Sequence, residues 1–484
     1  MAGGHGPSYL WLSPMNALLC AALLSPGMPS AVPPQLPESA TPFQPQVSDP
    51  LLAPVPPAPV QLSSWDEALG LLRQRSSDLR TALAQVEAAA GQWRIALAAL
   101  LPTLQGIASV QSNVINPGST TFIGGGGVGG GVGGGTGAGG GAGEGLKTSS
   151  PLGVGTLSAS VPVVDLRGIT ALGTARESQR TAALSLAETR RQLTGQLTGA
   201  LVSVASSERL SEVNRVNLRT ALERLALAQR RLELGVGTQL DVVRVQQDAE
   251  TARDAVVTGD ELLRKARESL GLALGLSGPV GLAQGGDVTA LISQARHSCR
   301  KLETLDSRPD LAAARSRLTV AERGVTEVQR QYYPMLALQS TTVAVTVDPG
   351  FAQVPAWNVG AALVLPFWDG GVREGLLRQA RAGAEIARQA VVGLERSVSV
   401  EVLQARRAVE VAQAARDIAG RSRDLAQESD RLTRRSFEVG SGTSLELVQS
   451  AGALRQAELQ LVLREFQLQE AKVTAFLAEA ACDW

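Results

Sequence analysis

Side chains that could support metal, redox or nucleophilic chemistry are scarce in this 484-residue chain. The two imidazoles are His5 and His297, and the three thiols are far apart at Cys20, Cys299 and Cys482. A zinc site or a histidine general base needs several such groups at short spacings. We therefore expect no metal, no cofactor and no catalytic centre. Thiols spaced this widely also predict no disulfide framework.

A glycine-rich tract at 124–145 contains G-x-G-x-x-G strings, which in another context would indicate nucleotide binding. Sixteen of its 22 residues are glycine. The tract follows no buried strand and opens no helix, and Lys147 is preceded by Leu146 rather than by glycine. These features argue against a phosphate-binding loop. We interpret residues 114–155 as a flexible loop insertion.

Composition narrows the function classes further. Lysine and arginine total 45, as do aspartate and glutamate, so the chain is neutral and lacks the basic excess of a nucleic-acid binder. Aromatic residues make up 3% of the chain, although 44% is hydrophobic. Aromatic rings carry much of the buried area in ordinary cores. The composition therefore predicts long helices packed through small residues.

The N-terminal region differs from the rest of the chain. Residues 1–27 include a short apolar stretch that suits a secretory signal peptide, although no lysine or arginine precedes Arg73. Residues 28–61 are rich in proline and predict an extended, disordered linker. No apolar run anywhere reaches 18 residues, so we expect no transmembrane helix.

The rest of the chain contains one series of motifs twice. RRLELGVGTQLDVV at 230–243 matches RSFEVGSGTSLELV at 435–448, and VPVVDLRG at 161–168 matches LPFWDGGV at 365–372. A third pair of matching segments precedes these in each half. Because the order is the same in both halves, we predict an internal duplication. Its parts are a first repeat at 62–275, a joining segment at 276–308 and a second repeat at 309–484.

The residue pattern of each repeat predicts one helix, two strands and a long helical hairpin. We expect the helices at Asp66–Leu101 and Pro309–Tyr332, each ended by proline. In the second repeat the strands are expected at Leu336–Val347 and Trp357–Leu365, separated by the turn-like 348–356. Apolar and polar residues alternate in these segments and at 157–161, as in outer-membrane strands. Apolar residues at intervals of seven predict coiled-coil packing: Leu218, Leu225 and Leu232, and Val391, Val398, Ala405, Ala412, Ala419 and Ala426.

Four strands per chain are too few to close a membrane barrel, which needs about eight. An open strand edge in lipid would leave backbone groups unpaired. If the strands cross a membrane, the chain must therefore assemble, and three copies would supply twelve strands.

The chain resembles the TolC-like outer-membrane efflux proteins over about residues 62–480. The resemblance rests on WDEAL at 65–69, PFWDGG at 366–371 and the two G-x-G-T-x-L-[DE]-[VL] turns. It implies a mainly α fold with a small β part and an internal duplication. Long coiled-coil hairpins would form an α-barrel in the periplasm, and a homotrimer would share a twelve-stranded transmembrane β-barrel in the outer membrane.

The same resemblance implies an exit duct of a tripartite efflux pump or a type I secretion system. Such a duct passively conducts small molecules or polypeptides. Its partners would be a periplasmic adaptor (membrane fusion) protein and, through it, an inner-membrane pump, with no cofactor and no nucleic acid. The alternatives are a soluble coiled-coil scaffold and a periplasmic adaptor. A scaffold needs no paired strands, and an adaptor should have one hairpin rather than two.

The resemblance also places a periplasmic aperture at the hairpin tips, and assigns to it Asp241, Glu446, Gln449 and Phe437. Rings of acids would favour cations. Gln449 stands where a second acid often lies, Phe437 where a gating tyrosine can lie, and Gly442 where a basic partner lies, so we predict no salt-bridged lock there. From the residues alone, the two acids could instead complement the dipole of the following helix.

Two further groups of residues follow from the same resemblance. From sequence alone, the tip glycines also suit a positive φ and the threonines suit helix caps. The adaptor-docking tips comprise Gly235, Val236, Gly237, Thr238, Leu240, Gly440, Gly442, Thr443 and Leu445. The strand–helix junctions comprise Pro162, Asp165, Pro366, Asp369, Gly370 and Gly371. Trp357, near a strand end, is a candidate for an aromatic girdle.

Overall fold

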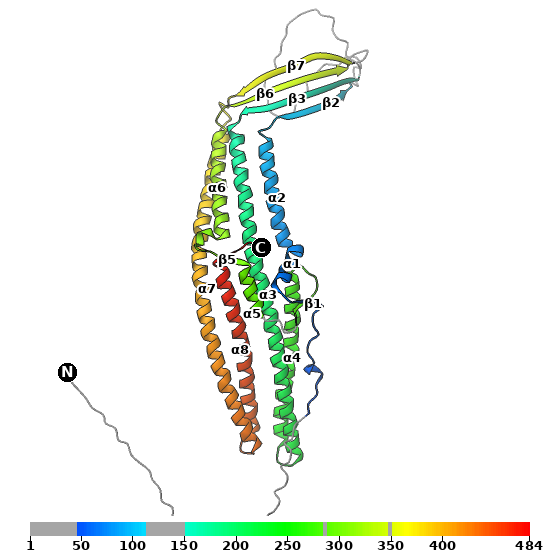
Figure 1. The fold of residues 1–484 in the computed structure, drawn as a ribbon, viewed down its shortest axis with the longest axis vertical. Coiled ribbons are helices and arrows are strands. Elements are labelled where there is room, and N and C mark those ends of the chain that lie inside the picture. The colour runs from blue at the N-terminus through cyan, green and yellow to red at the C-terminus, as the bar shows by residue number, and fades with distance from the viewer. Residues whose placement is uncertain (1–45, 113–150, 284–287, 347–350) are drawn as a thin grey trace, which may run out of the picture. The chain divides into compact units, whose positions relative to one another are not determined.

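The same series of elements occurs twice along the chain, which confirms the predicted duplication (Figure 1). The first series is α2 (Ser77–Ala98), β2 (Thr103–Gln111), β3 (Leu152–Val164), α3 (Leu166–Glu233) and α4 (Gln239–Ala273). The second series is α6 (Pro309–Arg330), β6 (Met335–Thr346), β7 (Phe351–Val364), α7 (Val372–Glu438) and α8 (Ser444–Leu477).

The computed structural model describes residues 46–112, 151–283, 288–346 and 351–484. Within this part, residues 47–484 cluster into one unit. The predicted signal peptide and most of the glycine-rich loop lie outside the described residues. The fold confirms the expected class, since long helical hairpins predominate and a small sheet accompanies them.

One antiparallel sheet joins the two repeats in the strand order β2-β3-β6-β7 (Figure 1). Paired residues lie on the same face of a sheet, so the register defines the two faces. One polar row crosses all four strands as Gln105, Ser158, Thr341 and Asn358. The adjacent row places Leu104 and Val359 on the opposite face, which Val161 and its partner Leu338 share further along the strands. The predicted alternation is therefore present in the folded sheet.

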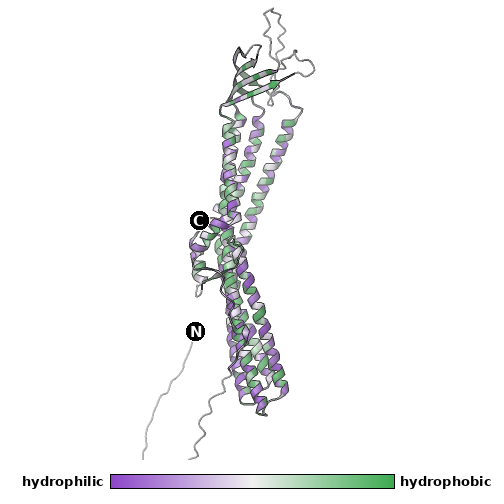
Figure 2. Cartoon of the chain, turned by 90° about the vertical axis from the view of Figure 1, so that its right-hand side faces the viewer, coloured by the Kyte–Doolittle hydropathy of each residue, from purple (hydrophilic) through white to green (hydrophobic). Residues whose placement is uncertain are grey.

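Helices α3 and α4 form one hairpin, and α7 and α8 form the other. Hydrophobic and hydrophilic residues alternate along the long helices (Figure 2), and the first hairpin packs through small and aliphatic side chains. Leu218 is fully buried against Ala249, Ala252 and Val256 of the partner helix. Alanine at these positions lets the two helices approach closely. Of the predicted heptad residues, Val391, Val398 and Ala405 are buried, and the others on α7 are partly exposed.

The segment between the repeats packs against the middle of the helices. It contains β4 (Val280–Leu282), α5 (Val288–His297), β5 (Cys299–Lys301) and the 3-10 helix η2 (Leu305–Ser307). Trp65, at the start of α1 (Trp65–Arg75), is 1% exposed within the largest core cluster, and its indole Nε1 donates to Ser298 Oγ at 3.2 Å. The WDEAL motif therefore anchors α1 to the segment between the repeats.

The sequence predicted no disulfide framework, and it did not anticipate the single disulfide that two of the three cysteines form. Strand β5 pairs antiparallel with a C-terminal strand, β8 (Ala480–Cys482), and Cys299 is in register with Cys482. Their sulfurs form a disulfide across a sequence separation of 183 residues. Spacing along the chain could not reveal this bond, because the pairing of two three-residue strands sets it.

The predicted disordered linker is also ordered in its last part. The 3-10 helix η1 (Pro50–Leu52) lies on α3 and α4, where Asp49 Oδ2 accepts from Arg253 Nε at 2.9 Å. Strand β1 (Val60–Leu62) then pairs in parallel with β4. Residues 47–62 therefore form a strap along the first hairpin.

Three predicted boundaries needed correction. The helix expected at Asp66–Leu101 is split at Ser76, whose side chain accepts from Leu79 N at 3.3 Å and caps α2. Strand β3 begins at Leu152, within the segment interpreted as a loop. Residues 351–356, expected to be a turn, continue β7. In each strand, pairing with a neighbour extends the regular structure beyond the alternating pattern. Among the helices of the described residues, none has the length and hydropathy to cross a membrane.

Candidate functional site

Two similar turns form the hairpin tips, one between α3 and α4 and the other between α7 and α8. Gly235 and Gly440 have φ of 73° and 84°, a region that favours glycine. A Cβ on Gly237 or Gly442 would lie about 3 Å from backbone nitrogen of the preceding helix. The glycines of the tips therefore fit the requirements of the turns. This agrees with the interpretation from turn chemistry and leaves the docking interpretation open.

Each tip continues into a capped helix. Thr238 Oγ1 accepts from Asp241 N at 3.2 Å, and Asp241 Oδ2 accepts from Thr238 N at 3.0 Å. Thr443 and Glu446 make the equivalent pair, at 3.3 and 2.9 Å. These are capping boxes, in which side chains satisfy the free N–H groups at a helix start. The backbone hydrogen bond from Thr443 lowers the pKa of Glu446.

The two acids differ in their surroundings. A hydrogen bond from Ser444 of the second tip, followed by one from Thr238, lowers the pKa of Asp241. Ser444 is buried, so Asp241 lies where the two tips of one chain meet. Glu446 and Gln449 are exposed. Of the two acids assigned to the aperture, Glu446 is thus the more accessible in the single chain.

Phe437 connects the tips rather than standing free. Its side chain is 4% exposed, and the Arg231 guanidinium lies 4.3 Å from the ring centroid. Arg231 also donates to the Phe437 carbonyl. Because α3 supplies the arginine and α7 the aromatic ring, this contact links the first hairpin to the second. The hydrophobic tip residues Val236, Leu240 and Leu445 remain exposed.

Two ion pairs, one buried and one partly buried, also connect the hairpins, and sequence reasoning missed them. Arg224 Nη2 lies 2.9 Å from Asp430 Oδ1, and Arg455 Nη2 lies 2.7 Å from Asp248 Oδ1. The partners stand 206 and 207 residues apart, close to the offset of 205 between the matching tip motifs. Nearly equivalent positions in the two repeats of one chain therefore face each other. Opposite charges at that offset are the signal that could have revealed them.

A carboxyl group lies beside these pairs. Burial raises the pKa of Glu458 on α8, while a hydrogen bond from Asn217 and the charge of Arg423 act in the opposite direction. Ser450 Oγ donates to Asp430 Oδ1 at 3.3 Å. The hairpins therefore share a polar layer above the tips, in addition to their apolar contacts.

The strand–helix junctions are built around two aspartates. Asp165 Oδ1 accepts from Gly168 N at 2.8 Å and caps α3. Asp369 accepts from Gly371 N and from Arg373 Nε, at 3.1 and 2.7 Å, and the bond from Arg373 lowers its pKa. Gly371 has a φ of 89°, which explains the GG of the motif.

The two prolines of the junctions have separate positions. Pro162 lies in β3 next to an irregularity in its pairing with β6. The Pro366 carbonyl accepts from Arg373 Nη1 at 3.0 Å.

Within the described ranges, no three His, Cys, Asp or Glu side chains come together as a metal site.

Comparison with known proteins gives a match over both repeats. A family model described as outer membrane efflux protein matches residues 68–276 and 302–477. The fusaric acid resistance protein FusA of Burkholderia cepacia is 29% identical over 171 residues, which are 34% of this chain and 32% of that protein. The match therefore spans about a third of that curated relative's length.

Solved structures have the same fold. The outer membrane protein VceC of Vibrio cholerae matches with a TM-score of 0.68 at 18% identity, over 86% of this chain and 95% of VceC. The open state of the MtrE outer membrane channel of Neisseria gonorrhoeae matches with a TM-score of 0.67 at 18% identity, over 86% and 88%. At these identities the likeness is one of fold.

Proposed function

Since the chain belongs to the outer membrane efflux protein family, we propose that it is the outer-membrane exit duct of an efflux pump. The duct would passively conduct molecules from a periplasm-spanning complex to the exterior. The family match across both repeats is the observation that carries this proposal. No catalytic step is part of it, because conduction needs only a continuous aqueous path.

The sheet suits a membrane. Its four strand segments contain no Asp, Glu, Lys, Arg or His. One face carries exposed Leu104, Val359 and Leu363, which suit lipid, while the hydroxyl and amide row on the other face suits water. Trp357 lies on the apolar face, and its Nε1 donates to Ser340 Oγ at 2.8 Å, so its polar group is satisfied.

The disulfide between Cys299 and Cys482 supports export, since such bonds persist in oxidising compartments.

A homotrimer is the assembly we propose. Within the described part of one chain, β2 and β7 each pair on one side only, which leaves two open edges. Helix α7 also carries exposed apolar residues at intervals of seven, which suit a neighbouring helix. These residues are 55–74% exposed in the single chain, and the last is the C-cap of the helix: Val411, Ile418, Leu425, Leu432 and Val439. Three chains would pair the edges into twelve strands and cover the stripe.

The hairpin tips are the proposed aperture and adaptor-docking site. Glu446 and Gln449 would line the opening, with Asp241 close by, and Phe437 would support it from beneath through Arg231. Exposed Val236, Leu240 and Leu445 give an adaptor an apolar surface. An inner-membrane pump would supply the energy through that adaptor. The name of the FusA relative supports a small organic cargo over a polypeptide.

Membrane fractionation with planar-bilayer recording tests the duct. We expect the full chain in the outer-membrane fraction, and a detergent-extracted trimer that forms conducting channels. A monomer in the soluble fraction would contradict the proposal and favour a scaffold without a pore.

The aperture has its own test in Glu446→Gln. Glutamine can keep the capping contact to Thr443 while it removes the charge. We expect weaker block of the channel by multivalent cations in planar bilayers, since three carboxylates around an axis attract cations. Glu212→Gln, which neutralises an exposed carboxylate on α3, is the matched control. Unchanged block in Glu446→Gln would remove this residue from the aperture.

A further inference from the structure

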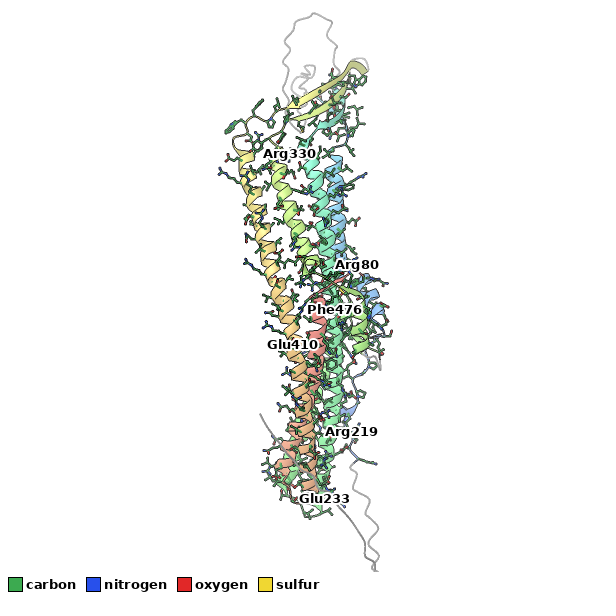
Figure 3. The ribbon with its side chains drawn as sticks, turned by 60° about the vertical axis from the view of Figure 1, so that its left-hand side comes forward. Arg80, Arg219, Glu233, Arg330, Glu410 and Phe476 are labelled. Atoms are coloured by element: carbon green, nitrogen blue, oxygen red, sulfur yellow. A yellow bond between two sulfur atoms is a disulfide. The ribbon has the colours of Figure 1, made fainter. Side chains whose placement is uncertain are left out.

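A cavity of about 470 Å³ lies where the strands meet the helices, apart from the tips. Residues from several elements line it, including Arg167 at the start of α3, Arg330 and Tyr333 at the end of α6, and Trp368 and Arg373 before and within α7. Figure 3 shows Arg330 beside the strand ends, with Glu233 at the far end of the helices. The cavity therefore combines basic and aromatic groups at the foot of the sheet.

The residues that line this cavity carry more positive than negative charge. Asp369 is paired with Arg373, and Asp165 caps α3. Arg330 lies 5.1 Å from the Tyr333 ring centroid. Among the described residues, neither Arg330 nor Arg167 forms an ion pair with a carboxylate. Two guanidinium groups remain for one capping carboxylate, so the cavity suits an anion, and arginine matches phosphate geometry well.

Large apolar side chains border the same cavity. Trp368, which lines the cavity, is 84% exposed in the loop before α7, and the adjoining Phe367 is 86% exposed. Met335 and Val364, at the paired ends of β6 and β7, are exposed as well. Aromatic rings next to a membrane strand favour the interface between hydrocarbon and head groups. A ligand that satisfies both the rings and the arginines must be amphipathic and acidic.

We propose that this junction cavity binds an acidic phospholipid. The phosphate would lie between Arg167 and Arg330, Trp368 would contact the glycerol region, and the acyl chains would follow the apolar face of the sheet. This inference rests on the proposed membrane position of the sheet. A free phosphate ion would use the arginines but gain nothing from the exposed rings.

The test is lipid binding to the detergent-extracted full-length assembly, measured by native mass spectrometry. Phosphatidylglycerol is titrated into the wild type, Arg167→Ala/Arg330→Ala and Trp368→Ala, and phosphatidylcholine is titrated in parallel. We expect phosphatidylglycerol to bind more tightly than phosphatidylcholine. The double arginine variant should weaken phosphatidylglycerol binding by about tenfold or more, and Trp368→Ala should weaken both lipids. Arg209→Ala, an exposed arginine elsewhere on α3, should behave as the wild type.

Inorganic phosphate as competitor separates the two sources of the anion. The lipid site predicts that phosphate displaces phosphatidylglycerol poorly, because it lacks the apolar part. Full displacement by phosphate, with no effect of Trp368→Ala, would overturn the lipid assignment in favour of a free-anion site. Equal phosphatidylglycerol binding by wild type and arginine variant would overturn the site altogether. If the same preparations still conduct in bilayers, the duct stands and only this inference fails.

Discussion

At the scale of single residues, the buried charges between the hairpins are the contacts with most consequence. Arg224 and Asp430 are both almost fully buried, and their attraction offsets part of the cost of lost hydration. Removal of one partner leaves the other charge buried and unpaired. Any widening at the tips that separates the first hairpin from the second must also separate these charges.

We therefore predict that Asp430→Asn destabilises the folded chain by about 3–5 kcal/mol. Arg224→Met/Asp430→Leu, which removes both charges and keeps apolar volume, should recover most of the loss. The measurement is the midpoint of thermal unfolding at a fixed heating rate, followed by circular dichroism. The exposed pair Arg209–Glu212 provides the control, because Glu212→Gln should cost no more than about 1 kcal/mol. Equal midpoints for Asp430→Asn and Glu212→Gln would contradict a stabilising role of the buried pair.

Glu458 gives a prediction for pH. Burial raises its pKa in the folded chain, so between about pH 4.5 and the raised pKa the folded form keeps a proton that the unfolded form has lost. Its contribution to stability is present at lower pH and is lost as pH rises through the raised pKa. Glu458→Gln cannot lose a proton and keeps nearly the same side-chain volume. Its unfolding midpoint should therefore rise above that of the wild type as pH increases from 4 to 8, and parallel curves for the two proteins would refute the assignment.

At the scale of elements, the disulfide joins two short strands that could hardly pair alone. Strands β5 and β8 have three residues each, and the bond between them closes a loop of 183 residues. The C-terminus is held further by Trp484, whose Nε1 donates to Thr194 Oγ1 of α3 at 2.8 Å. The segment between the repeats and the end of the chain are thus fixed to the same helix.

Cys299→Ser/Cys482→Ser should lower stability by about 2–4 kcal/mol, because the unfolded chain regains the freedom that a closed loop removes. A reducing agent should lower the unfolding midpoint of the wild type towards that of the variant and leave the variant unchanged. Thermal unfolding with and without reductant provides the measurement. A midpoint of the wild type that does not respond to complete reduction would show that strand pairing alone holds the C-terminus.

The elements that could be predicted from sequence are those whose signal is local. The tip glycines, the capping threonines and the alternation at 357–365 each lie within a few residues, so the pattern alone identifies them. The disulfide, the strap at 47–62 and the burial of Phe437 depend on partners about 180 to 230 residues away. Periodicity carries no information about such pairing. The repeat offset does, and Arg224 with Asp430 illustrates a contact that it could have identified.

At the scale of the whole molecule, the described part of a single chain leaves strand edges and an apolar helix surface uncovered. Among the described residues, β2 and β7 each have one edge without a neighbouring strand, and α7 exposes a stripe of apolar residues at intervals of seven. Each large aliphatic side chain on that stripe would gain about 1.5–3 kcal/mol on full burial. A neighbouring chain could pair with the strand edge and cover the apolar stripe at the same time, because it supplies both a strand and a helix. In the proposed duct, assembly would therefore decide whether the sheet can enter a membrane and whether the helices can enclose a channel.

Ile418→Glu/Leu425→Glu should prevent the trimer from forming, because the new carboxylates would be buried without partners in the contact between chains. Light scattering of the detergent-extracted protein measures the mass directly, and we expect monomers without channel activity in planar bilayers. Gln427→Glu is the control, since it adds a carboxylate to an exposed position of α7 off the stripe and should leave the trimer intact. A conducting trimer of the double variant would mean that the stripe faces the channel rather than a neighbour, and that the open strand edges alone hold the chains together.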